Sequence, residues 1–126
     1  MQGLYTEIHN EKEIVVIDYS IVPHELEFDL MKYSLEYITK YERTSALVLE
    51  IISRVKLKQE ILDYFPQYFD EIKGHVKRWG SVGFGKLIFK EMIDTKLITP
   101  RPGENRNIDW FETKEEALEF LIQDYQ

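Results

Sequence analysis

The chain has 126 residues, an apolar fraction of 44% and a formal net charge of −7, and it contains no cysteine. This length and composition suit a single domain over residues 1–126. Without cysteine, the chain can form neither disulfides nor thiolate metal sites, and it has no cysteine nucleophile. The negative charge argues against nucleic-acid binding, because neutralisation of phosphates by basic residues supplies most of that affinity.

The sequence has the pattern of neither a signal peptide nor a membrane span. The first residues, MQGLYTEIHNEKE, lack the basic start and the apolar run of a signal peptide. The apolar runs, such as Ile14 to Ile17, are far shorter than a membrane span. We therefore expect a soluble, cytoplasmic protein that has no contact with a membrane.

The first third of the chain predicts two strands and a helix. Leu4–His9 alternates weakly and predicts a strand, followed by a polar hairpin turn and the β-branched run Glu13–Tyr19, which is typical of a buried strand. Pro23 suits the first position of a helix, because its missing N–H would be unpaired there in any case. A stripe of apolar residues at helical spacing continues this helix to Tyr41.

The middle of the chain repeats this alternation. Ala46–Ile52 predicts a second buried strand, and Lys56–Ile72 has the pattern of a helix. Pro66 lies inside that helix and should kink it or break it near Phe65, since proline removes a hydrogen bond and clashes with the preceding turn. Val76–Val82 predicts the next strand.

The last third predicts two further helices and one strand. Phe84–Leu97 is expected to be a helix, Thr99–Asn107 a loop and Ile108–Phe111 a short strand. Thr113 and Glu116 have the spacing of a capping box at the start of the final helix.

The predicted order is β-β-α-β-α-β-α-β-α, which indicates the α/β class. Strands that alternate with helices form a mostly parallel sheet, here of four or five strands, with helices packed on it. The first strand should pair antiparallel with the second, because the connection between them is short.

The stretch GSVGFGKL at residues 80–87 resembles a phosphate-binding P-loop but departs from it. Leu87 stands where the motif needs a hydroxyl for magnesium, and Gly80 falls inside the predicted strand rather than after it. We interpret Gly83 and Gly85 as a sharp strand-to-helix turn. An anion-binding helix start at Gly83, Gly85 and Lys86 remains open as a functional alternative.

Other polar residues give weaker signals. The three histidines are far apart and predict no metal site, and Ser20 and Ser53, which follow strands, are expected to stabilise turns or cap helices. Glu50 is the odd charge on a buried strand, and we expect it to reach solvent or to pair with Arg54.

An aromatic cluster surrounds Pro66. It consists of Tyr64, Phe65, Tyr68 and Phe69. Two of these four residues are expected to face the core and the other two to form an exposed patch for a partner, for which Tyr64 and Tyr68 are the candidates.

With these elements in place, the chain resembles the SpoIIAA-like proteins, relatives of STAS domains that are often labelled STAS/SEC14-like. The resemblance runs from about Glu13 to Ile122 and is carried by IVVIDYS, ALVLEI, WGSVGFGKLIFKEM and above all WFETKEEALEFL. It implies a sheet with packed helices, a bacterial origin and, for most members, no established activity. STAS domains proper are protein-interaction modules, some of which are switched by a serine in a D-S-[ST]-G turn. Ser53 is the only hydroxyl in the corresponding EIISRVKL, without the preceding Asp or the following Gly.

These observations together favour a non-enzymatic regulatory or protein-interaction module with no metal and no cofactor. Its expected working surface is the carboxyl edge of the sheet, formed by Ser20, Ser53, Arg54, Gly83, Gly85 and Lys86. The alternative is a small-molecule binding domain, with an anionic ligand on the Gly83–Lys86 helix start or an apolar ligand between sheet and helices. The sequence leaves the partner, the ligand and the oligomeric state open.

Overall fold

The computed structural model describes residues 1–53, 55–56, 58–83 and 107–123. Within this part of the chain, five strands form one sheet in the order β1-β2-β3-β4-β5. Their bounds are β1 Leu4–His9, β2 Lys12–Asp18, β3 Ala46–Ile51, β4 Val76–Val82 and β5 Ile108–Phe111. As predicted, β1 is antiparallel to β2 and the other neighbouring pairs are parallel.

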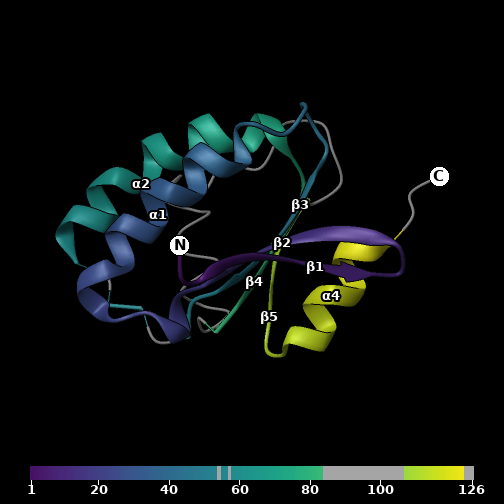
Figure 1. Cartoon of the computed structure of the whole chain (residues 1–126), viewed down its shortest axis with the longest axis horizontal. Helices are drawn as coiled ribbons and strands as arrows, with labels where there is room; N and C mark the ends of the chain where they lie inside the picture. Colours follow the sequence, from purple (N-terminus) through teal and green to yellow (C-terminus); the bar gives the residue numbers. More distant parts are fainter. Residues whose placement is uncertain (54, 57, 84–106, 124–126) are drawn as a thin grey trace.

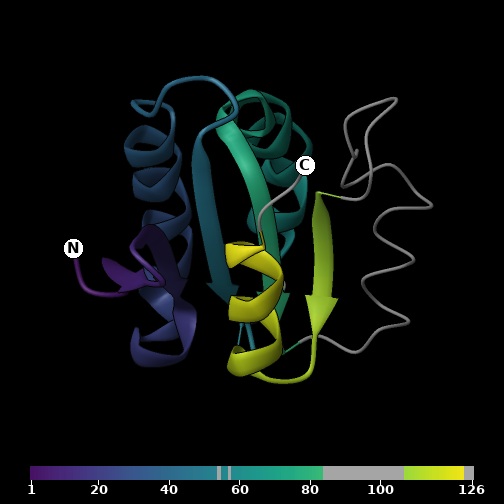
Figure 2. The same cartoon turned by 90° about the vertical axis from the view of Figure 1, so that its right-hand side faces the viewer.

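Three α-helices in the described ranges cover the two faces of this sheet. Helices α1 (Glu27–Ile38) and α2 (Gln59–Ile72) lie side by side on one face, and α4 (Lys114–Ile122) lies on the other (Figures 1 and 2). Because β2, β3 and β4 follow one another in the same direction across the sheet, right-handed crossovers place α1 and α2 on the same face. The helix predicted over Phe84–Leu97 and most of the loop predicted over Thr99–Asn107 lie outside the described residues. No helix among the described residues is long and apolar enough to cross a membrane.

The sheet separates two apolar clusters. Alternate residues of β2 point to opposite faces, so Val15 and Ile17 pack with α1 and α2, while Ile14 and Val16 pack beneath α4. The larger cluster lies on the α1/α2 side. In it, the ring of Trp79 on β4 makes edge-to-face contacts with Tyr68 and Phe69 of α2. Burial on both faces explains why β2 and β3 read as continuous apolar runs rather than as alternating ones.

The helix starts differ in detail from the prediction. Pro23 precedes a 3₁₀ turn, η2 (His24–Leu26), and α1 begins only at Glu27. At α4, the Thr113 hydroxyl accepts a hydrogen bond from the backbone N–H of Glu116 at 3.2 Å, as a capping box requires. The Glu116 carboxylate accepts a hydrogen bond from the Thr113 hydroxyl at 3.0 Å, where the predicted capping box has it accept from the backbone N–H of Thr113.

Helix α2 runs through Pro66 without a break, so of the two predicted alternatives, a kink or a break near Phe65, the break was wrong. Proline has no N–H, so the carbonyl of Leu62 loses its donor. Because Pro66 is exposed, water can reach this side of the helix, and the buried residues on the opposite side hold α2 on the sheet.

Candidate functional site at the carboxyl edge of the sheet

Two of the predicted surface residues meet where β3 and β4 end. The backbone N–H of Ile52 donates to the carbonyl of Val82 at 2.8 Å, which carries the pairing of the two strands to their last residues. Gly83 has a φ of +115°, and a Cβ atom placed on it would lie 2.4 Å from the backbone of Ser53. The exposed Ser53 therefore stands directly beside a position that only glycine fills without strain.

Ser20 lies in η1 (Tyr19–Ile21), the short 3₁₀ turn that follows β2 and packs against β3. Its backbone N–H donates to Asp18 Oδ1 at 2.9 Å, and its hydroxyl donates to the same oxygen. Both polar groups of Ser20 are thus occupied in holding the turn, in agreement with the structural role expected from the sequence.

Two exposed apolar side chains belong to the same connection between β2 and α1. Ile21 is 48% exposed and Leu26 is 37% exposed. Ile21 is the last residue of η1, and Leu26 is the last residue of η2. Leu26 belongs by its helical spacing to the apolar stripe predicted from Pro23 to Tyr41, so the burial expected for it was wrong: it lies in the turn before α1. Ile21 lies in a connecting segment and carries no periodic signal.

Beneath this edge lies a buried polar cluster on the α1/α2 side of the sheet. Ile17, Glu50, Ser81 and Trp110 occupy one row across four neighbouring strands. The Ser81 hydroxyl donates to Glu50 Oε1 at 3.1 Å and accepts from the indole N–H of Trp79, also at 3.1 Å. Glu50 is only 5% exposed, so the expectation that it reaches solvent was wrong; its described partner is Ser81, and Arg54 lies outside the described residues.

The burial of Glu50 changes its acid–base chemistry. Removal from water raises the pKa of its carboxyl from 4.5 to about 7, although hydrogen bonding from Ser81 and Trp79 opposes this change. A carboxyl group in this range can gain or lose a proton near neutral pH.

Two buried tyrosines from different elements extend the cluster. Ser34 of α1 donates to the carbonyl of Met31 at 2.7 Å, and its hydroxyl lies 2.8 Å from that of Tyr68. Burial raises the pKa of Tyr68 and of Tyr19, and the nearby Glu50 adds to the increase for both. The tyrosine hydroxyls therefore stay protonated and act as neutral hydrogen-bonding groups.

A second buried carboxylate fixes the start of α1. Glu27 is fully buried; His24 Nδ1 lies 2.8 Å from one of its oxygens, and the backbone N–H of Lys56 donates to the other at 3.2 Å. An acidic side chain in the first turn also suits the helix dipole. Glu27 thus ties the connection after β2 to the segment after β3, which fixes the geometry of the edge.

The predicted aromatic patch is only partly present on the surface. Tyr68 is 1% exposed and faces Trp79 and Ser34, so its assignment to an exposed patch was wrong. Tyr64 is half-buried, and its ring makes an edge-to-face contact with Phe28 of α1 at 5.4 Å between centroids.

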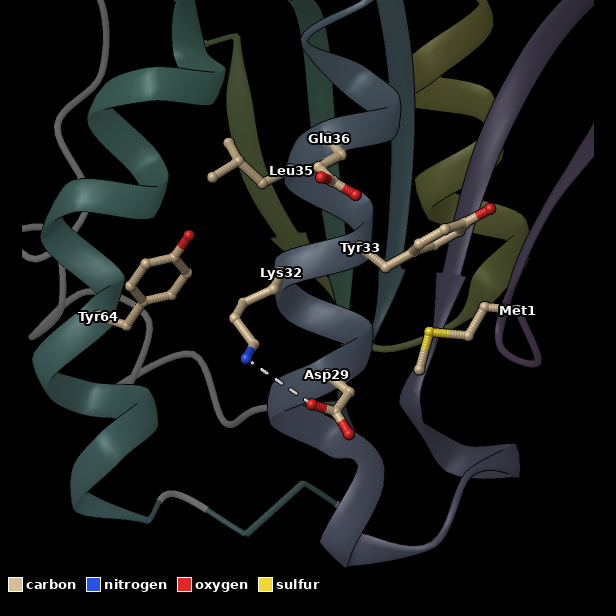
Figure 3. Close-up of a pocket in the computed structure, with 7 residues that line it drawn as sticks. All are labelled: Met1, Asp29, Lys32, Tyr33, Leu35, Glu36 and Tyr64. Atoms are coloured by element: carbon tan, nitrogen blue, oxygen red, sulfur yellow. Dashed lines mark ion pairs between the residues drawn. The ribbon is translucent and has the colours of Figure 1, made fainter.

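Tyr64 lines an open pocket of about 530 Å³ on the outer side of α1 (Figure 3). The surface ion pair between Lys32 and Asp29, 3.8 Å apart, belongs to the same pocket, and Tyr33 points away from Tyr64. The residues that line this open pocket come mainly from α1, and their side chains do not converge on a common point (Figure 3).

Residues with catalytic or metal-binding potential are sparse in the described part of the chain. His9 contacts Glu7, His24 contacts Glu27, and His75 contacts the carbonyl of Tyr41. No group of three or more potential metal ligands occurs among the described residues. Arg54, Gly85 and Lys86, which complete the predicted surface and the alternative anion site, lie outside the described residues.

Comparisons with known proteins add no relative. No protein-family model, no curated protein and no solved structure matches the chain.

Proposed function

We propose that this chain is a non-enzymatic regulatory or protein-interaction module of the SpoIIAA-like, STAS-related type. Its carboxyl edge would bind a protein partner through Ile21, Leu26 and Ser53. The observation that carries the proposal is the exposure of two apolar side chains, at 48% and 37%, in the connection that begins where the parallel strand β2 ends.

Hydrogen bonds within this edge support the proposal. Asp18 holds the turn of Ser20, and Glu27 joins the two connections that follow β2 and β3. A preformed surface loses little conformational freedom on binding, so more of the contact energy appears as affinity. Apolar side chains with a polar rim, here Ile21 and Leu26 with Ser53, have the character of a protein-binding surface.

Ser53 offers a means of regulating such binding. Its side chain is exposed, and a phosphate on it would add nearly two negative charges to the edge. We expect Ser53→Asp and Ser53→Ala to differ in partner affinity; equal affinity of both variants and the wild type would exclude a switch at this position.

The experiment that tests the proposed surface is partner capture from the native cells with tagged variants. Ile21→Glu and Leu26→Glu place a charge on the edge, and Tyr33→Glu is the matched control, because Tyr33 is equally exposed (40%) but lies in the middle of α1. We expect one protein to be retained by the wild type and by Tyr33→Glu and to be lost, at least tenfold, from the two edge variants. Retention by all four forms would contradict the proposed surface.

A further inference from the structure

Strand β1 forms an edge of the sheet that lacks the usual protection. Among the described residues it pairs with β2 alone, and the antiparallel register runs from Leu4 with Ile17 to His9 with Lys12 without a shift. Edge strands commonly carry lysine, proline or a bulge that prevents pairing with another chain. The sequence of β1, LYTEIH, contains none of these.

The register determines which backbone groups of β1 point outward. The N–H of Asp18 donates to the carbonyl of Gly3 at 2.7 Å, so Gly3 and Asp18 form a hydrogen-bonded pair. Such pairs alternate along an antiparallel ladder. Tyr5, Glu7 and His9 therefore direct their backbone groups toward β2, and Leu4, Thr6 and Ile8 direct theirs away from the sheet. The N–H of Leu4 donates to the carbonyl of Met1 at 3.3 Å, so pairing at this end of β1 replaces that bond.

The side chains of β1 divide between the two faces. Leu4 and Thr6 lie opposite Ile17 and Val15, which places them and Ile8 on the α1 face. Ile8 is 66% exposed, more than any other large apolar residue described. On the α4 face, Glu7 contacts Lys114 at 3.1 Å and His9 at 2.8 Å.

We propose that β1 pairs antiparallel with β1 of a second copy of this chain, about a two-fold axis through Thr6. The two sheets then continue into one another. In this register Thr6 faces Thr6 of the second copy, Leu4 faces Ile8, and Tyr5 faces Glu7.

This register is self-complementary. On the α1 face, the exposed Ile8 of each copy lies opposite Leu4 of the other, and the two Thr6 side chains lie opposite each other. Apolar pairs and threonine pairs are both favourable between neighbouring strands. On the α4 face a tyrosine, rather than a like charge, lies opposite each Glu7. The two Glu7 carboxylates are diagonal neighbours, and each is already held by Lys114 and His9 of its own chain. A two-fold pairing uses the same five residues, Leu4 to Ile8, from both partners, which is why the sequence favours a second copy over an unrelated strand.

Cysteine crosslinking tests both the pairing and its register, because the chain contains no other cysteine. In a hydrogen-bonded antiparallel pair the Cα atoms lie about 5.5 Å apart, within the range that a disulfide spans. In the proposed dimer, Thr6→Cys should therefore crosslink to near completion under mild oxidation. The matched control is Ile8→Cys. In the proposed dimer the two cysteines of this variant would lie four positions apart along the strands, about 13 Å, so they should not crosslink.

Sedimentation of the full-length chain supplies a second, independent test. We expect the wild type to be a dimer and Ile8→Lys to weaken association at least tenfold. The control Gln67→Lys adds the same charge at an exposed position of α2 and should sediment like the wild type. Circular dichroism of each variant confirms folding. A monomeric wild type at all concentrations, or crosslinking of Ile8→Cys rather than Thr6→Cys, would overturn the proposal.

Discussion

Glu50 is the residue whose environment changes its chemistry most. Its carboxyl is buried, receives a hydrogen bond from Ser81 and faces no cation among the described residues. Its pKa is higher in the folded chain (about 7) than the ordinary value of 4.5. The folded state therefore binds a proton that the unfolded state releases, and stability must fall as the pH rises between these two values.

Glu50→Gln isolates this effect, because the amide keeps the shape and the acceptor oxygen but carries no charge. The stability of the variant relative to the wild type should increase from about pH 4.5 to about pH 7 and then stay constant. The total change should be on the order of 3 kcal/mol, as follows from a pKa difference of two to three units. Urea denaturation at a series of pH values measures it, with Glu42→Gln, at an exposed position, as control. A stability difference between Glu50→Gln and the wild type that does not vary with pH would contradict the raised pKa of Glu50.

Gly83 allows a second prediction at the level of single residues. An alanine there would combine a φ of +115° with a Cβ atom 2.4 Å from the Ser53 backbone, so Gly83→Ala should lower the free energy of unfolding by more than about 1 kcal/mol. Gly80→Ala is the control, since its new Cβ would meet Ala117 at 3.4 Å and no backbone atom that close. Thermal denaturation compares the two variants, and equal losses would contradict the close approach of β3 and β4 at their ends.

At the level of elements, the start of α4 is the feature that a single side chain controls most directly. Thr113 caps the helix by accepting the N–H of Glu116. Thr113→Ala should cost about 1 kcal/mol, and Thr113→Ser should restore most of it, because serine also caps helices well. If both variants unfold at the same urea concentration as the wild type, the cap contributes nothing.

Most of the strands and helices could be predicted because their signals are local. The apolar runs at β2 and β3 and the exact span Val76–Val82 follow from composition and bounding polar residues. The boundaries of α1 and α2 could not be predicted, because 3₁₀ turns and irregular segments share the apolar pattern of the helix that follows. The continuity of α2 depends on the exposure of Pro66, which is a property of the packed molecule.

The candidate site, too, could be predicted from the sequence only in part. The meeting of Ser53 and Gly83 was predictable, since the carboxyl ends of neighbouring parallel strands share an edge. The cluster around Glu50 was not, because Ser34 and Tyr68 come from two different helices and share no sequence pattern. Tyr68 was misplaced for a related reason: helical spacing identifies a face, but not how deeply that face is covered.

At the scale of the whole molecule, the two proposed binding surfaces lie at different borders of the sheet. Its carboxyl edge carries the residues proposed to bind a partner, and its β1 edge carries those proposed to join two copies. The two surfaces use different residues, so variants at Ile21 and at Ile8 should affect partner binding and self-association independently.

The most direct measurement of the central claim is a native mass spectrum of the tagged chain isolated gently from its own cells. The interaction-module proposal predicts this chain, as one copy or two, bound to a second protein in a fixed ratio. That second mass should be absent when Ile21→Glu is isolated in the same way. A spectrum that contains only this chain would contradict the proposal, and one with a small added mass would contradict it in favour of the ligand-binding alternative.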